Sequence, residues 1–305
     1  TPIKSSAASD VYKRQMVEWW NGISACYDLT NPKARGHLKG KLAAMREKYG
    51  VDGFKFDAGD KGAVSEGIDF FEGATPSDYC EAWAKMGLDF PYNEYRACWK
   101  MGLQPLVQRL QDKPYSWEGI TQLIPDMLAA GLLGHPYACP DMIGGGEFRS
   151  FLNPDMTPID PSKIDQKLIL RSCQIHALMP MMQFSVAPWR ILDKKNLEIC
   201  RKFADLHKQF GPYILELAHN AAKTGEPIVR HMEYEFPNQG FENSKDQFML
   251  GPKYLVAPVV TPEDSREVKL PAGEWKDDLG KVWNGGQTIK IDVPIDRLPY
   301  FEKLK

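Results

Sequence analysis

A short apolar segment that ends on a carboxylate places the strongest constraint on this chain. Residues 53–56 read as a buried strand that ends at Asp57 and breaks at Ala58 and Gly59. In (β/α) barrels, catalytic groups lie at the C-terminal ends of buried parallel strands. Because a buried charge is costly, Asp57 needs a compensating role, either in chemistry or as a helix cap or turn former. The segment therefore indicates an α/β fold and leaves both roles of Asp57 open.

Helices and short strands are expected to alternate up to about residue 225. Asn31 and Pro32 are an N-cap and a first-turn proline, and they predict a helix that runs to about Tyr49 and stops at Gly50. We expect further helices over residues 77–86, 117–133, 161–178 and 194–223, and strands over residues 97–99, 105–110 and 137–139. This alternation predicts βαβ units around a parallel sheet or barrel.

The pattern changes after about Glu226. Short segments that read as strands are separated there by turns rich in proline, glycine and asparagine. We expect strands at residues 248–250, 254–260, 267–270, 287–293 and 299–301. Residues 226–305 are therefore predicted to form a small antiparallel β-sandwich.

Composition is that of an ordinary globular protein. The chain has 305 residues, a formal net charge of −2 and 26% charged residues, so no basic excess points to nucleic acid or to an anionic membrane. No apolar run is long enough to predict a transmembrane helix. The six cysteines form no C-x-x-C pair and are predicted to be buried free thiols.

The first residues of the chain are expected to be non-native. Residues 5–15 match the translation of a widely used sequencing adapter without a mismatch. Such segments are excluded from reasoning about the fold. We therefore treat residues 1–15 as adapter-derived, and we expect the gene to be truncated at its 5′ end.

Three acidic residues follow predicted strands, namely Asp57, Asp112 and Asp141. Several strand-end carboxylates at one face of a barrel could form a paired-acid site. One ionised and one protonated carboxyl group suit glycoside hydrolysis. Spacing alone does not establish that two of these groups form such a pair.

Six motifs that follow one another along the chain resemble glycoside hydrolase family 31. They lie at residues 19–22, 28–32, 49–57, 140–145, 227–237 and 298–301. The resemblance implies that residues 16–225 are the C-terminal part of a catalytic (β/α)8 TIM barrel, which is incomplete because its first strands are missing. It also implies that residues 226–305 are the proximal C-terminal β-sandwich domain.

The same resemblance assigns the chemistry. Asp57 matches the family nucleophile and Asp112 matches the acid/base of a retaining, exo-acting mechanism. The two carboxyl groups would then lie about 5–5.5 Å apart. No metal or organic cofactor is implied, and the expected partner is an oligosaccharide or glycoside substrate.

The resemblance is strongest to an α-galactosidase-like branch of the family, in which a lysine stands two residues before the nucleophile, as Lys55 does here. Lys55 and Asp57 point to the same side of a strand. The resemblance implies that six residues bind the substrate: Trp20, Lys55, Arg96, Trp99, Arg109 and Asp141. Four of these have alternatives: a structural ion pair for Lys55, a core position for Trp20, a surface position for Arg96 and a supporting role for Asp141.

Other functions stay open at this point. The substrate could be an α-glucoside or α-xyloside, or the chain could be a non-catalytic carbohydrate-binding fragment. A metal-dependent hydrolase using Asp57, Asp60 and Asp141 is a further hypothesis, although no His pair has ligand spacing. The isolated chain is expected to be poorly folded and inactive. Oligomeric state and localisation are left open, with a bacterial periplasmic or secreted protein as one option.

Overall fold

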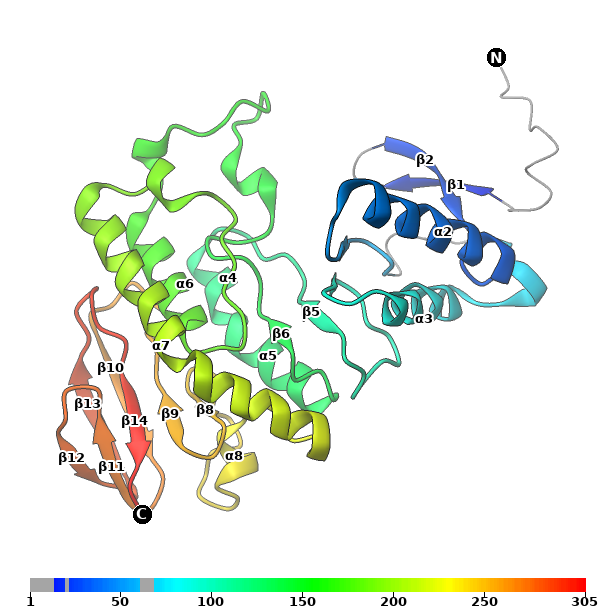
Figure 1. Cartoon of the computed structure of the whole chain (residues 1–305). Coiled ribbons are helices and arrows are strands. Elements are labelled where there is room, and N and C mark those ends of the chain that lie inside the picture. The colour runs from blue at the N-terminus through cyan, green and yellow to red at the C-terminus, as the bar shows by residue number, and fades with distance from the viewer. Residues whose placement is uncertain (1–13, 20–21, 61–68) are drawn as a thin grey trace. The chain divides into compact units, whose positions relative to one another are not determined.

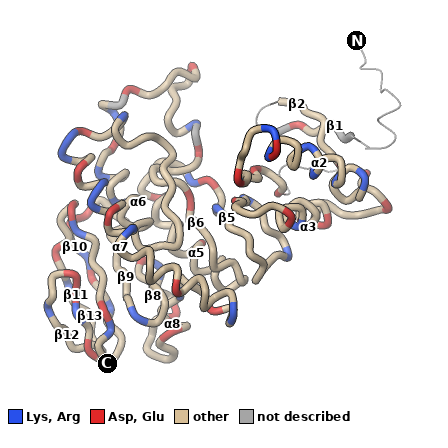
Figure 2. Tube along the Cα trace, in the orientation of Figure 1, with Lys and Arg blue, Asp and Glu red and all other residues tan. Residues whose placement is uncertain are grey.

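The computed structural model describes residues 14–19, 22–60 and 69–305 (Figure 1). The chain divides into two compact units, an N-terminal unit of residues 1–109 and a C-terminal unit of residues 110–305. Basic and acidic residues are interspersed along the trace of each unit (Figure 2). Within the described ranges, no helix is both long enough and apolar enough to cross a bilayer.

The two helices of the N-terminal unit begin at the capping residues that the sequence supplies. Helix α2 (Pro32–Tyr49) starts after Asn31, whose side chain accepts a hydrogen bond from Lys33 N, and ends at Gly50 with φ 64°. Helix α3 (Pro76–Met86) starts with a capping box between Thr75 and Asp78. These helices confirm the predicted boundaries, because both ends depend on local chemistry. Strands β1 (Arg14–Trp19) and β2 (Gly22–Tyr27) form an antiparallel pair.

The candidate nucleophile, Asp57, follows the first of three short parallel strands. Strand β3 (Lys55–Phe56) pairs with β4 (Glu94–Tyr95), which pairs with β5 (Val107–Arg109). The predicted strand at residues 97–99 is wrong, because pairing on both sides places β4 at residues 94–95 instead. The parallel register agrees with the predicted α/β class.

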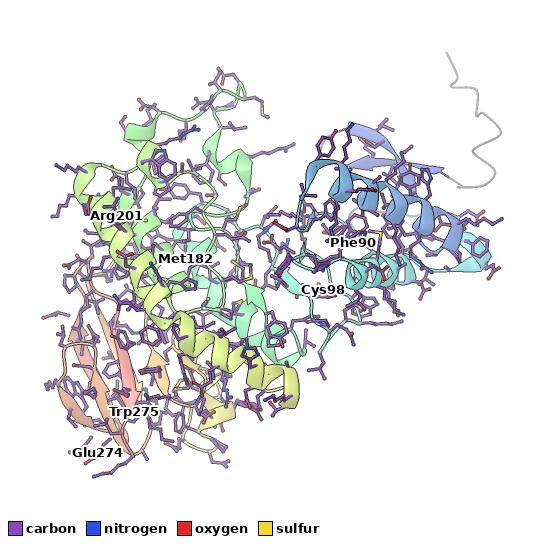
Figure 3. The ribbon with its side chains drawn as sticks, in the orientation of Figure 1. Phe90, Cys98, Met182, Arg201, Glu274 and Trp275 are labelled. Atoms are coloured by element: carbon purple, nitrogen blue, oxygen red, sulfur yellow. The ribbon has the colours of Figure 1, made fainter. Side chains whose placement is uncertain are left out.

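Aromatic side chains pack against one another in the core beside these strands. Phe56 and Tyr95 stack with ring centroids 4.9 Å apart, and both side chains are buried. Phe90 and Cys98 belong to the same core cluster (Figure 3). Burial raises the pKa of the Cys98 thiol to about 12, as expected for an unreactive core cysteine. All six cysteines are free and five are buried, so the prediction of buried free thiols is confirmed for all except the partly exposed Cys26.

The C-terminal unit begins with helices. The predicted helix over residues 117–133 is divided into α4 (Trp117–Thr121) and α5 (Leu123–Leu132). Pro125 explains the division, because it has no N–H to donate to the carbonyl of Thr121 and its ring crowds that carbonyl. Strand β6 (Ala138–Cys139) follows.

Two long helices pack on each other in the core of this unit. Helix α6 (Gln166–Ala177) starts later than predicted, because Asp165 caps it through Leu168 N and residues 161–163 form a 3₁₀ turn. Helix α7 (Lys194–Thr224) agrees with its prediction and packs against α6 (Figure 1). Their apolar faces join α5 and strands of the C-terminal domain in one core cluster.

The C-terminal domain is a mostly antiparallel β-sandwich, as predicted. One six-stranded sheet has the order β12-β11-β14-β9-β8-β7, and β10 pairs with β13 in a second sheet. The bounds are β7 (Val229–Arg230), β8 (Phe248–Leu250), β9 (Tyr254–Val256), β10 (Ser265–Leu270), β11 (Glu274–Asp277), β12 (Val282–Asn284), β13 (Gln287–Asp292) and β14 (Tyr300–Lys303), with helix α8 (Met232–Glu235) after β7. Trp275 is fully buried in its core, and its indole N–H donates to the carbonyl of Pro271 at 2.9 Å (Figure 3).

Candidate active site

The candidate nucleophile lies directly after strand β3. Asp57 Oδ1 accepts a hydrogen bond from Ala58 N at 2.9 Å, and Ala58 has a left-handed φ of 60°. A non-glycine residue in that region is strained, and such strain is common at functional sites. The side chain of Asp57 is 56% exposed. The carboxylate is therefore presented to solvent at a sharp turn.

Arg96 lies between two of the acidic residues. Its Nη1 is 3.6 Å from Asp57 Oδ1, and its Nε donates to Asp60 Oδ2 at 3.2 Å. The side chain is 29% exposed, so the guanidinium is partly shielded by the fold. This arrangement places a fixed positive charge beside the candidate nucleophile.

Lys55 pairs with a residue that sequence reasoning missed. Its Nζ is 3.2 Å from Glu94 Oε1, and the parallel register sets Lys55 opposite Glu94. The structural ion pair considered for Lys55 is thus present. Glu94 is visible in the sequence two residues before Arg96. Its pairing with Lys55 depends on the register of β3 and β4, which the sequence does not show.

The remaining predicted residues of the N-terminal unit differ in exposure. Trp99 is 53% exposed, as a sugar-stacking platform requires, whereas Arg109 is 3% exposed at the end of β5. Trp20 lies outside the described residues. The structure therefore leaves Trp99 more accessible to a ligand than Arg109.

In the C-terminal unit, Asp112 and Asp141 lie against the same backbone position. Asp112 follows β5 by three residues and is partly buried, while Asp141 follows β6 and is fully buried. A Cβ placed on Gly146 would collide with Oδ1 of both carboxylates. The structure thus brings these two predicted residues together.

Asp141 joins the two loops that follow β5 and β6. Its Oδ2 accepts hydrogen bonds from Lys113 N at 2.7 Å and from Gly146 N at 2.8 Å. Its backbone carbonyl accepts from the Cys139 thiol at 3.0 Å. Two backbone amides on one buried carboxylate oxygen hold that oxygen firmly.

Lys113, which follows Asp112, is a second residue that sequence reasoning missed. Its side chain is 4% exposed, and its Nζ lies 2.7 Å from Asp126 Oδ2. The same ammonium donates to the carbonyls of Gln111 at 2.9 Å and Pro140 at 3.2 Å. A lysine beside a candidate acid was visible in the sequence, but its burial was not.

His176 in α6 supports the same region from the core. Its Nδ1 is 2.7 Å from the carbonyl of Ser172, and its Nε2 is 3.0 Å from the carbonyl of Asp141. Burial lowers the pKa of His176, although both carbonyls oppose that shift. A neutral imidazole has one N–H, so it donates to one of these two carbonyls at a time.

The candidate residues fall into two groups. Asp57, Asp60 and Arg96 meet in the N-terminal unit, and Asp112 and Asp141 meet in the C-terminal unit. The short separation between Asp57 and Asp112 stays a prediction. In the part of the chain that the structure describes, no three His, Cys, Asp or Glu side chains are grouped so that they could hold a metal ion.

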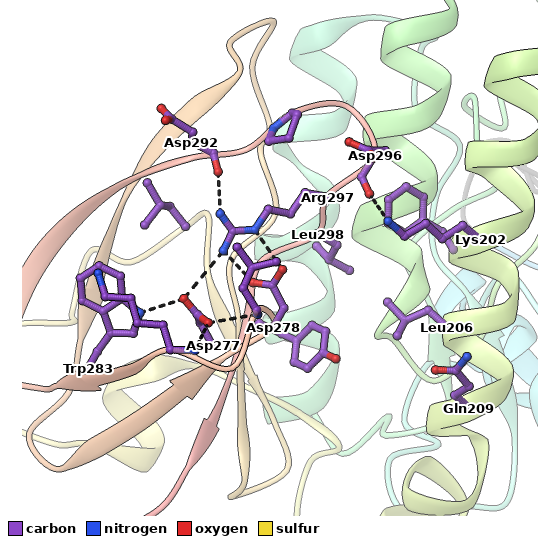
Figure 4. Close-up of a pocket in the computed structure, with 16 residues that line it drawn as sticks. Lys202, Leu206, Gln209, Asp277, Asp278, Trp283, Asp292, Asp296, Arg297 and Leu298 are labelled. Carbon is purple, nitrogen blue, oxygen red and sulfur yellow. Dashed lines mark hydrogen bonds and ion pairs between the residues drawn. The ribbon is translucent and has the colours of Figure 1, made fainter.

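A separate cavity of about 720 Å³ lies between α7 and the β-sandwich (Figure 4). Arg297 forms a two-pronged contact with Asp278 at 2.8 and 2.9 Å, and Trp283 Nε1 donates to Asp277 at 2.9 Å. These charged and polar groups form hydrogen bonds with one another between the loops of the sandwich. We interpret the network as structural, because its polar groups already have protein partners.

Known proteins share sequence with this chain along most of its length. The family model described as "Glycosyl hydrolase family 31 C-terminal domain" matches residues 225–304. The chain is 34% identical over 291 residues to the myogenesis-regulating glycosidase of Mus musculus, covering 92% of this chain and 40% of that protein. It is 26% identical over 318 residues to alpha-glucosidase 2 of Bacillus thermoamyloliquefaciens, covering 94% and 38%.

The fold agrees with these matches. A Flavobacterium johnsoniae GH31 dextranase complexed with isomaltotriose superposes with a TM-score of 0.83 at 24% identity, covering 95% of this chain and 38% of that chain. The likeness shows that the chain shares the fold of part of that protein. The chain belongs to glycoside hydrolase family 31. It spans about 40% of the length of the two curated relatives described above.

Proposed function

We propose that this chain carries both catalytic carboxylates of a retaining, exo-acting α-glycosidase. The observation that carries the proposal is that Asp57 and Asp112 each follow one of three strands in parallel register, β3 and β5. The carboxyl ends of parallel strands are where barrel enzymes keep their catalytic groups. Membership of glycoside hydrolase family 31 supports glycoside hydrolysis as the chemistry of these positions.

The mechanism follows from two carboxyl groups with different roles. Asp57 attacks the anomeric carbon and forms a glycosyl–enzyme ester, while Asp112 protonates the departing glycosidic oxygen. Asp112, now ionised, removes a proton from water, which attacks the same carbon and releases the sugar and Asp57. The partly shielded Arg96 guanidinium, 3.6 Å from Asp57, holds that carboxylate in place for attack.

We further propose that residues 16–225 form part of a (β/α)8 barrel and that the complete site requires the longer protein. The parallel register of β3, β4 and β5 supports this proposal. Strand β3 has two residues, and the side chains at its end are about half exposed. A site this open does not enclose a sugar, so we expect residues 1–305 alone to be inactive.

The proposed specificity is α-galactosidase-like. Lys55, two residues before Asp57, supports a galactoside or another epimer, because the α-galactosidase-like branch that the sequence resembles has a lysine at this position. The name alpha-glucosidase 2 of one relative supports an α-glucoside as the second candidate. Trp99 would stack on the apolar face of the sugar in either case.

One assay separates these candidates. The full-length protein that carries this chain is given nitrophenyl α-galactoside and nitrophenyl α-glucoside, beside its Asp57→Ala and Asp112→Ala variants. We expect preferential cleavage of the galactoside and a large loss of turnover in both variants. Preference for the glucoside would overturn the specificity alone, and wild-type turnover by Asp57→Ala would overturn the mechanism. Asp52→Ala, at an exposed carboxylate before β3, is the matched control.

A further inference from the structure

We propose that Gly146 is a positioning residue for the Asp112 carboxyl group. The inference rests on the proposed function, in which Asp112 is the acid/base. The reason for glycine at this position is space, because the two carboxylates occupy the volume that a Cβ would need. The φ of Gly146 is outside the left-handed range, so the backbone conformation itself does not demand glycine.

The two carboxylates beside Gly146 differ in burial. Asp141 is fully buried, and two backbone amides hold its Oδ2. Asp112 is partly exposed at the protein surface. A methyl group on residue 146 would collide with both carboxylates. Because the Asp141 carboxylate is buried and held by two amides, we expect residue 146 to shift away from Asp141, and the methyl group then displaces the Asp112 carboxyl group.

The main chain beside Asp112 is also fixed, which confines the displacement to the side chain. The amide of Lys113 is bound to Asp141, and its ammonium is held by Asp126 and by the carbonyl of Pro140. The loop cannot shift as a whole without breaking these contacts. We therefore expect the Asp112 carboxyl group to rotate rather than its backbone to move.

A rotated acid has a specific kinetic signature. A proton donor must lie within hydrogen-bond reach of the leaving oxygen, and a misplacement of about 1 Å costs on the order of 10²-fold in rate. A substrate with a strongly acidic leaving group needs little proton donation. The loss caused by a displaced acid therefore depends on the leaving group, whereas a general structural defect lowers both rates alike.

The test is Gly146→Ala in the full-length protein, with a methyl α-galactoside and a dinitrophenyl α-galactoside as substrates. We expect kcat/KM for the methyl glycoside to fall about 10²-fold and that for the dinitrophenyl glycoside to fall less than about 3-fold. An equal loss on both substrates, or no loss on either, overturns the inference. Gly40→Ala is the matched control, because a Cβ on Gly40 in α2 meets no atom within 4 Å.

Asp112→Ala on the same two substrates separates this inference from the proposed function. If Asp112→Ala shows no dependence on the leaving group, the assignment of the acid/base fails. If it shows the dependence and Gly146→Ala does not, only the role of Gly146 fails. Should Gly146→Ala not fold, the double variant Gly146→Ala/Asp112→Ala decides. Recovered folding supports the collision with Asp112, whereas continued failure shows that the collision with Asp141 dominates and overturns the inference.

Discussion

The parallel strands of the N-terminal unit and the antiparallel C-terminal sandwich place their charged residues differently. In the sandwich, Trp275 and Phe301 are fully buried, and β14 is paired on both sides. In the N-terminal unit, strand β3 has two residues and leads directly to the half-exposed Asp57. The sandwich buries apolar surface along its strands, whereas the N-terminal unit uses short strands to present polar groups.

The residues that stabilise the fold and the residues proposed for chemistry lie in different parts of this chain. Fully buried aromatic residues contribute the most to folding, because the free energy of burial scales with apolar area. Strand-end carboxylates and an arginine 3.6 Å away contribute little to stability, but they are arranged for reaction. Substitutions in the two regions should therefore affect different measurements.

The largest expected effect is on activity. Asp57→Ala should lower the kcat of the full-length protein by about 10⁴-fold or more, because the variant lacks the group that forms the covalent intermediate. Its denaturation midpoint should stay close to wild type, because the side chain is 56% exposed. Steady-state kinetics and chemical denaturation check both statements. A large drop in stability would contradict the proposed separation of roles.

The second effect is on stability. Trp275→Ala should lower the free energy of unfolding by about 3–5 kcal/mol, because it removes a fully buried indole from the core of the sandwich. Urea denaturation followed by circular dichroism measures the change. Trp283→Ala, at a partly exposed indole, is the control and should cost less. Equal losses in the two variants would show that burial does not set the stability of this domain.

A smaller effect is expected at the start of helix α2. Asn31→Ala removes the side chain that accepts from Lys33 N at 2.9 Å and should cost about 1 kcal/mol. Asn31→Asp keeps the acceptor and should restore most of this loss. Thermal denaturation of the two variants tests the assignment, and an Asn31→Asp variant as unstable as Asn31→Ala would contradict it.

The smallest effect depends on pH. Burial lowers the pKa of His176 below its unfolded value of 6.5, so the unfolded state binds more protons in acid. This histidine therefore lowers stability as the pH falls below about 6.5, and it has no such effect at higher pH. Denaturation at pH 7.5 and pH 5.5 should show a smaller acid-induced loss for His176→Asn than for wild type. An identical loss in both proteins would contradict this account.

The parts of the fold set by local chemistry could be predicted from the sequence. Asn31, Pro32 and Gly50 fixed both ends of α2, whereas the effect of Pro125 on the helix after Trp117 was overlooked. Strands β11 and β12 were missed because each is short; charged residues flank Trp275 in β11, and β12 has only three residues. Their identity depends on pairing with distant strands.

The candidate site was likewise predictable only where its sequence signal is local. Strand-end position pointed to Asp57, Asp112 and Asp141, because that signal is local. The contacts of Glu94 and Gly146 could not be predicted, since they arise from strand register and from the approach of two loops. Long-range contacts of this kind leave no spacing signal in a single sequence.

Covalent labelling tests the central claim most directly. The full-length protein is treated with a fluorinated α-galactosyl fluoride, which forms the glycosyl–enzyme ester faster than water releases it, and the labelled peptide is sequenced by mass spectrometry. We expect one sugar per chain, attached to Asp57 in the peptide that follows β3. A label on another carboxylate, or turnover of α-galactosides by a protein that never carries the label on Asp57, would contradict it.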